Sequence, residues 1–326
     1  MLQMVRERRP VEALARYVTC VWVQEVSPDS APFVHRKAPD GGAEVVCAIG
    51  SVPRVLGPQT GPVVETLEPG TTIVGVRLRP GAAPPVLHLP ASEAADHDLG
   101  ADELYGGWAV ALGDALADAD SPDRAAALLE QAVADRLAEG PDLDPLVAEA
   151  VQRLGPAEAS DLRSLASALY VSERQLRRRC EAAVGMTPKA LHRILRFQRF
   201  IALAWTLERP STQLARLAAD AGYSDQAHLT REAKQLEGRS PRTLLLESEQ
   251  RCGCGHDHAA SYGPLLEAGR SRGGRASTIK RSLRPGADAL TRERARSAGS
   301  PQARAYGVAR SAGPRPGRRR RRSTAR

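Results

Sequence analysis

Arginine, histidine and glutamine side chains gather in two short stretches of the sequence, residues 174–178 and 226–231. If these stretches are helical, most of the residues share a face, because positions three and four apart are neighbours on a helix. Arg can contact phosphates or the acceptors of guanine, and Gln pairs with adenine. We therefore predict contacts to double-stranded DNA, with no catalytic residue, enzyme activity, cofactor or metal. The predicted contact residues are Arg174, Arg177, Arg178, Gln226, His228 and Arg231.

An internal repeat must position these side chains. The copies begin at Leu162 and Leu214, and an offset of 52 residues holds as far as Ser172 and Ser224. Each copy predicts a short helix, a tight turn and a Ser that caps the next helix by accepting its free N–H groups. Further on the offset is 53, which predicts one extra residue within the second recognition segment. This order is typical of a helix-turn-helix, whose second helix enters the major groove. Both Ser residues should face phosphates.

The second copy resembles the DNA-binding signature of AraC/XylS-type regulators across residues 222–241. The resemblance implies a long helix from about Pro188 to Leu207 that joins two subdomains. It also implies two recognition helices that face successive major grooves of a promoter or operator, about 34 Å apart. RNA polymerase would be a further partner of such a regulator.

Three residues depart from the pattern of that family. Cys180 and Ala233 stand where the family usually has Phe, which predicts looser packing at a cost of about 1–3 kcal/mol each. Tyr170 replaces the Gly of the first turn, where a left-handed backbone is easiest for Gly.

The front half predicts a β-rich domain followed by helices. Short apolar runs between Val11 and Leu89 are separated by Gly and Pro, which indicates strands joined by turns. From Ser92 to Leu154 apolar residues recur at helical spacing, for example at Ala126, Leu129 and Val133, and predict helices that join the two parts and could serve in dimerisation. The predicted strands are Tyr17–Val26, Ala43–Ile49, Val52–Leu56 and Thr72–Leu78.

Residues 38–46, 57–60 and 75–81 resemble an N-terminal domain of uncharacterised role that often precedes such modules. The likeness implies a small β-barrel, cupin-like at most, that senses a small-molecule effector. The predicted fold class is thus α+β multidomain. The predicted domains are a β-rich sensor (1–91), a helical linker (92–154), an all-α double helix-turn-helix (155–250) and a disordered Arg-rich tail (251–326).

Charge is distributed unevenly along the 326 residues. The net charge of +8 divides into −11 for residues 1–154, +4 for 155–250 and +15 for 251–326. The basic C-terminal half favours a polyanionic partner, and the acidic N-terminal half favours a ligand or protein partner. No apolar run is long enough for a membrane span, and the odd number of cysteines suits a reducing compartment. We expect a cytoplasmic monomer or homodimer.

Two alternatives remain open at this point. The first is a metal-dependent cupin-like enzyme, although His35, His88 and His97 are widely separated. The segment Cys252–His258 also packs four candidate zinc ligands into seven residues, but structural zinc sites usually draw ligands from two separate segments. The second is a basic nucleic-acid coating protein driven by its tail, which could raise nonspecific affinity by releasing counterions or could have no role.

Overall fold

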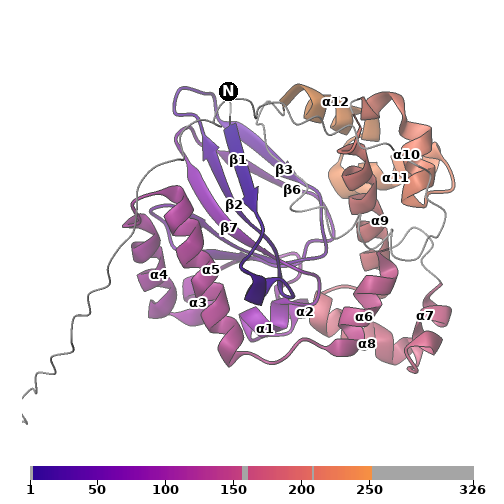
Figure 1. The fold of residues 1–326 in the computed structure, drawn as a ribbon, viewed down its shortest axis with the longest axis horizontal. Helices are drawn as coiled ribbons and strands as arrows, with labels where there is room; N and C mark the ends of the chain where they lie inside the picture. The colour runs from indigo at the N-terminus through magenta and orange to yellow at the C-terminus, as the bar shows by residue number, and fades with distance from the viewer. Residues whose placement is uncertain (1–2, 156–160, 208, 252–326) are drawn as a thin grey trace, which may run out of the picture. The chain divides into compact units, whose positions relative to one another are not determined.

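The computed structural model describes residues 3–155, 161–207 and 209–251 (Figure 1). Its N-terminal part contains a six-stranded antiparallel sheet in the order β1-β2-β7-β4-β5-β8 and a separate two-stranded sheet, β3-β6. The predicted sheet-rich domain is confirmed, but within the described residues its strands form two sheets and no closed barrel. The strands are β1 (Gln3–Arg8), β2 (Val18–Val26), β3 (Phe33–Lys37), β4 (Glu44–Ala48), β5 (Arg54–Leu56), β6 (Val63–Leu67), β7 (Thr72–Leu78) and β8 (Asp98–Gly100).

The centre of the large sheet is apolar because its strands are rich in β-branched residues. On β2 and β7, Val21 lies opposite Val76 and Val23 lies opposite Val74, and all four side chains are buried. Such cross-strand pairs stabilise a sheet and set its register. The four strands expected from the sequence are present as β2, β4, β5 and β7.

The long helix α5 packs against this sheet, and shorter helices lie around it (Figure 1). Helix α5 contacts both β7 and β2, and its Ala126, Leu129 and Val133 are buried in the core as the helical spacing predicted. The helix begins after Ser121, whose hydroxyl accepts a hydrogen bond from the Arg124 amide. The helices are α1 (Ala83–Leu87), α2 (Ala91–Ala94), α3 (Ala101–Tyr105), α4 (Gly107–Ala117) and α5 (Pro122–Glu139), with a 3-10 turn η1 (Glu12–Leu14) before β2.

The C-terminal part is helical and has its own core, in which Phe197 and Phe200 stack with ring centroids 5.8 Å apart. The long helix that the family resemblance implied is present as α9. Helix α6 lies in the predicted linker segment, but its Val147, Ala150 and Leu154 belong to this core. The helices are α6 (Pro145–Leu154), α7 (Leu162–Ala168), α8 (Glu173–Val184), α9 (Pro188–Ala204), η2 (Pro210–Thr212), α10 (Leu214–Ala221), α11 (Gln226–Glu237) and α12 (Pro241–Arg251).

Within the part of the chain that the structure describes, neither a membrane-spanning helix nor a metal-binding cluster is found. There, no helix has the length and apolar composition needed to cross a bilayer. The same residues contain no cluster of three or more His, Cys, Asp or Glu side chains suited to a metal ion. The Cys252–His258 motif and the tail predicted as disordered lie outside the described residues.

Candidate nucleic-acid interface

The first helix-turn-helix consists of α7 and α8, and a capping box starts its second helix. The hydroxyl of Ser172 accepts a hydrogen bond from the Gln175 amide at 3.2 Å, and the Gln175 side chain accepts one from the Ser172 amide at 3.0 Å. Two N–H groups at the helix start are thereby satisfied. The predicted capping role of Ser172 is confirmed.

Helix α8 has one buried face and one cationic face. Leu176 and Cys180 are completely buried, whereas Arg174, Arg177 and Arg178 are exposed. Burial raises the pKa of the Cys180 thiol to about 12, so this cysteine serves as a small apolar residue. Arg177 forms an exposed ion pair with Glu181 on the same helix at 2.9 Å, a contact too weak to withhold its guanidinium from a phosphate.

The second helix-turn-helix consists of α10 and α11, and its cap corrects the sequence prediction. The capping residue is Asp225, whose carboxylate accepts a hydrogen bond from the His228 amide at 2.6 Å. Ser224 does not cap the helix; its hydroxyl lies 3.2 Å from Nδ1 of His228. Hydrogen bonds from the His228 amide and neighbouring groups hold the pKa of Asp225 below its usual range, so the cap is an anion.

Equivalent residues of the two recognition helices are 53 positions apart in the sequence, whereas the residues of the preceding helices were matched at 52. Both are 12 residues long, and α8 begins at Glu173 where α11 begins at Gln226. The extra residue therefore lies in the turn of the second copy, before the helix, and not inside the recognition segment as predicted. Consequently Arg178 and Arg231 occupy equivalent positions on their helices.

Helix α11 exposes a polar face of its own. Leu229, Ala233 and Leu236 are buried as predicted, and Gln226 and Arg231 are exposed. The predicted looser packing at Cys180 and Ala233 stays a prediction, although both side chains are fully enclosed.

His228 is held in place more firmly than the other predicted contact residues. Its ring meets the ring of Tyr223 edge to face, with centroids 5.2 Å apart, and its side chain is 30% exposed. Only part of the imidazole can therefore reach a ligand.

A buried carboxylate that the sequence did not reveal fastens α11 to α9. Glu232 accepts hydrogen bonds from Arg193 at 2.9 Å and from Arg196 at 3.0 Å, and the Arg196 guanidinium lies 4.6 Å from the centroid of the Tyr223 ring. Burial acts to raise the pKa of Glu232, but the hydrogen bonds from the two Arg side chains outweigh it and the net shift is downward. These contacts hold the second recognition helix, α11, in a fixed orientation against α9.

The turn of the first copy contains a strained residue. Tyr170 has a φ of 55°, and the equivalent residue of the second copy, Gly222, has a φ of 90°. We expect Tyr170→Gly to raise the free energy of unfolding by up to about 1 kcal/mol, because Gly adopts this backbone without a Cβ clash. The Tyr170 side chain is 96% exposed, so little packing is lost.

Urea denaturation followed by amide exchange in α7 and α8 checks this expectation. Gly222→Ala is the matched control and should destabilise α10 and α11 instead. A loss of stability in Tyr170→Gly would show that the exposed ring contributes more than the strain costs.

Two families match this chain. A helix-turn-helix domain family matches residues 165–246, and a domain of unknown function (DUF6597) matches residues 6–100. No curated protein matches.

Solved structures with a similar fold include ToxT from Vibrio cholerae O395, at 11% identity and a TM-score of 0.37, with 75% of this chain and 96% of that chain covered. Another is unsaturated fatty acid bound wild-type ToxT from Vibrio cholerae strain SCE256, at 10% identity and a TM-score of 0.35, with 75% and 94% covered. The two helix pairs lie within the segment that the helix-turn-helix family matches. The chain therefore carries an N-terminal domain of unknown function followed by a C-terminal AraC-type helix-turn-helix domain, which is a DNA-binding domain.

Proposed function

We propose that this chain is a sequence-specific transcriptional regulator that binds duplex DNA through α8 and α11 and responds to a small-molecule effector through its N-terminal domain. The observation that supports the proposal most is the equivalence of Arg178 and Arg231 on two capped helices with buried inner faces. Two similar helices on one polypeptide can occupy neighbouring major grooves.

The two helix starts are assigned different roles. Ser172 is a neutral cap, and the Glu173 carboxylate in the first turn of α8 pairs with Arg163 at 3.5 Å, so the remaining free N–H groups at this helix start can accept a phosphate. Asp225 places a negative charge at the N-terminus of α11, which disfavours a phosphate there. Ser224 is exposed beside it and can donate its hydroxyl to a phosphate at the edge of the site.

Base and phosphate contacts are assigned to the exposed side chains. Gln226 and Arg231 are proposed to read base edges from α11, with His228 contributing a single ring nitrogen. On α8, Arg178 is proposed to read bases while Arg174 and Arg177 contact phosphates, which position the protein without carrying sequence information. Contacts with RNA polymerase and a monomeric or homodimeric state belong to the same proposal.

Arg231→Ala tests the DNA contact. Binding to the best duplex selected from a randomised pool should weaken about tenfold to a hundredfold, that is by about 1–3 kcal/mol, because a guanidinium that pairs with a base or phosphate is lost. Fluorescence anisotropy of labelled duplex over a series of salt concentrations measures both affinity and the number of phosphate contacts.

Arg124→Ala is the matched control, since Arg124 is exposed on α5 and lies outside the helix-turn-helix. Its affinity should equal that of the unaltered chain. Equal weakening by both substitutions would indicate a general charge effect, and undiminished binding of Arg231→Ala would remove this residue from the interface.

A further inference from the structure

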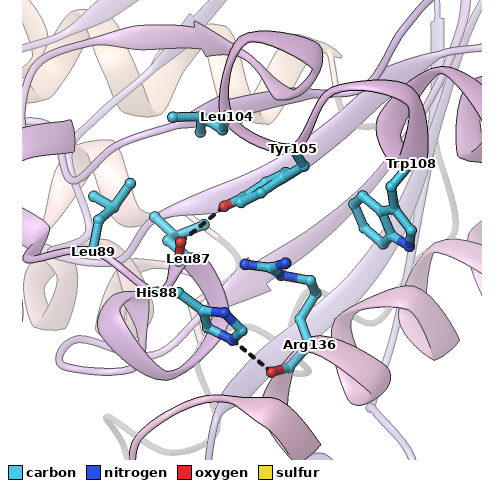
Figure 2. A pocket seen from close by; sticks show the side chains of 7 residues that line it. All are labelled: Leu87, His88, Leu89, Leu104, Tyr105, Trp108 and Arg136. Atoms are coloured by element: carbon cyan, nitrogen blue, oxygen red, sulfur yellow. Dashed lines mark hydrogen bonds between the residues drawn. The ribbon is translucent and has the colours of Figure 1, made fainter.

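A cavity of about 550 Å³ opens on the helical side of the N-terminal domain (Figure 2). Its walls come from the end of α1, from α3 and α4, and from α5. Residues 92–154 were predicted to join the domains, so a site in this segment was not expected. The lining residues are Leu87, His88, Leu89, Leu104, Tyr105, Trp108 and Arg136.

Arg136 is fixed at the centre of the lining. Its guanidinium carbon lies 4.1 Å from the ring centroid of Tyr105 and 5.7 Å from that of Trp108 (Figure 2). Its Nε donates a hydrogen bond to the carbonyl of Val86 at 3.2 Å. Tyr105 is itself held by a hydrogen bond from its hydroxyl to the carbonyl of Leu87 at 3.1 Å. Among the described residues no carboxylate lies within ion-pair distance of Arg136. Its half-buried charge is therefore available to an anion that enters the cavity.

The surroundings of that charge are apolar. A second, narrower space shares Tyr105, Trp108 and Arg136 with the cavity and continues to Leu112 and Val133 below them. Trp108 is 42% exposed although it is one of the largest apolar side chains. An exposed indole beside a preformed apolar floor is typical of a ligand platform. The ligand class that suits this cavity is an organic acid whose anionic group is attached to an aromatic or aliphatic moiety.

The rim of the cavity leads directly to the first recognition helix. His88 ends α1 with a φ of 58°, a strained conformation for a residue other than Gly. Residues 87–89 run into α2, and α2 contacts α8. The contact is close, because a Cβ added to Gly185 at the end of α8 would lie 2.9 Å from the carbonyl oxygen of Ala91. A shift of residues 87–89 would therefore move a backbone group that touches α8.

We propose that this cavity binds a small organic carboxylate with an aromatic or apolar body, and that its occupancy changes DNA affinity through α2 and α8. The coupling of ligand to DNA affinity rests on the proposed function, whereas the ligand site itself does not. The carboxylate pairs with Arg136, and the body stacks on Trp108 and Tyr105. The ligand shifts DNA affinity only as far as it binds one arrangement of α2 better than another.

Isothermal titration of the full chain with 3-phenylpropanoate tests the ligand class. Its neutral amide and propanoate serve as probes that lack the charge and the ring, respectively. We expect 3-phenylpropanoate to bind about tenfold more tightly than either, because a charge-assisted bidentate pair and a stacking surface each contribute. Equal binding of all three, or a Kd above about 10 mM for 3-phenylpropanoate, would overturn the assignment.

Two variants locate the site. Arg136→Met should weaken 3-phenylpropanoate about tenfold and leave the amide unchanged, whereas Trp108→Ala should weaken 3-phenylpropanoate and leave propanoate unchanged. Arg124→Met on the same helix is the control and should bind all three probes like the unaltered chain. Circular dichroism melting of each variant separates lost binding from lost folding. If Arg136→Met binds normally, or if folded Trp108→Ala binds normally, the cavity is not the site.

Anisotropy with the selected duplex separates this inference from the proposed function. We expect saturating 3-phenylpropanoate to change DNA affinity at least about fivefold in the unaltered chain and not in Arg136→Met, which is the lower end of the usual coupling between two sites. Unchanged DNA affinity despite ligand binding would refute the coupling through α2. Absence of DNA binding with or without the ligand would refute the proposed function while leaving the ligand site standing, since titration needs no DNA.

Discussion

Replacing Glu44 by Ala is expected to lower the free energy of unfolding by about 3–5 kcal/mol, because it removes a buried carboxylate and leaves two partly buried cations without their shared partner. Glu44 on β4 is 2% exposed, and its Oε1 lies 2.7 Å from Nζ of Lys37 and 2.5 Å from Nε of Arg77. Asp40 lies farther from both cations, at 3.5 Å and 3.3 Å, and cannot replace it at the same geometry. Amide exchange in β4 and β7 measures the loss within this domain.

The pH dependence of the same contact provides the check. Burial would raise the pKa of Glu44, but Lys37 and Arg77 outweigh it and lower the pKa from 4.5 to about 2. The folded chain therefore binds fewer protons here than the unfolded chain, so the contribution is complete above pH 4.5 and is lost as the pH falls toward 2. The stability difference between the unaltered chain and Glu44→Gln should shrink over that interval.

Glu68→Ala is the control for Glu44, since Glu68 is exposed in the turn before β7. It should change stability by less than about 0.5 kcal/mol. A loss in Glu44→Ala no larger than in the control would mean that water reaches Lys37 and Arg77 and that the cluster is not sealed.

Replacing Glu232 by Ala is expected to destabilise the helical part by about 3 kcal/mol, since Arg193 and Arg196 then lie side by side with no carboxylate between them. The Glu232 side chain is 9% exposed and the Arg196 side chain 16% exposed, so solvent compensates little of the loss at Arg196, whereas the Arg193 side chain is 34% exposed. We also expect weaker DNA binding, because α11 would no longer be held against α9. Amide exchange in α9 and α11 and anisotropy with the selected duplex measure the two effects.

Glu181→Ala is the matched control on the other recognition helix. Glu181 pairs with Arg177 four positions earlier, and both side chains are exposed, so its removal should cost about 0.3–0.5 kcal/mol. Similar costs for the two substitutions would show that the Glu232 contact is an ordinary surface pair and does not orient the helix.

The helix-turn-helix could be predicted from the sequence because its signals are local. Leu176 and Leu229 recur at helical spacing with their neighbours, and capping by Ser172 depends only on a residue three positions away. The second cap was placed one residue early because Ser224 and Asp225 are both good caps, and only the backbone conformation distinguishes them. The roles of the exposed residues in DNA binding remain predictions.

The strands at the edges were harder to predict than those at the centre. Strand β1 carries charged residues, and an ion pair at 2.7 Å between Arg6 and Glu25 of β2 helps to hold it. Among the described strands, β3 and β6 pair only with each other, and their residues alternate between partly buried and exposed except at the buried Leu67. Such strands depend on a partner far away in the chain, so composition alone does not mark them.

The two helix pairs and the central strands follow from local sequence signals, because hydrophobic period, caps and turns act over a few residues, whereas the long helix between the pairs was expected only from the family resemblance. Which charged side chains are exposed and which are held in contacts depends on how the helices and strands pack together. Arg178 is exposed on its helix, whereas Glu232 reaches Arg193 from α9 and Arg136 meets Tyr105 from α3. Burial and charge pairing depend on residues far apart in the chain, and these meet only when the elements pack together.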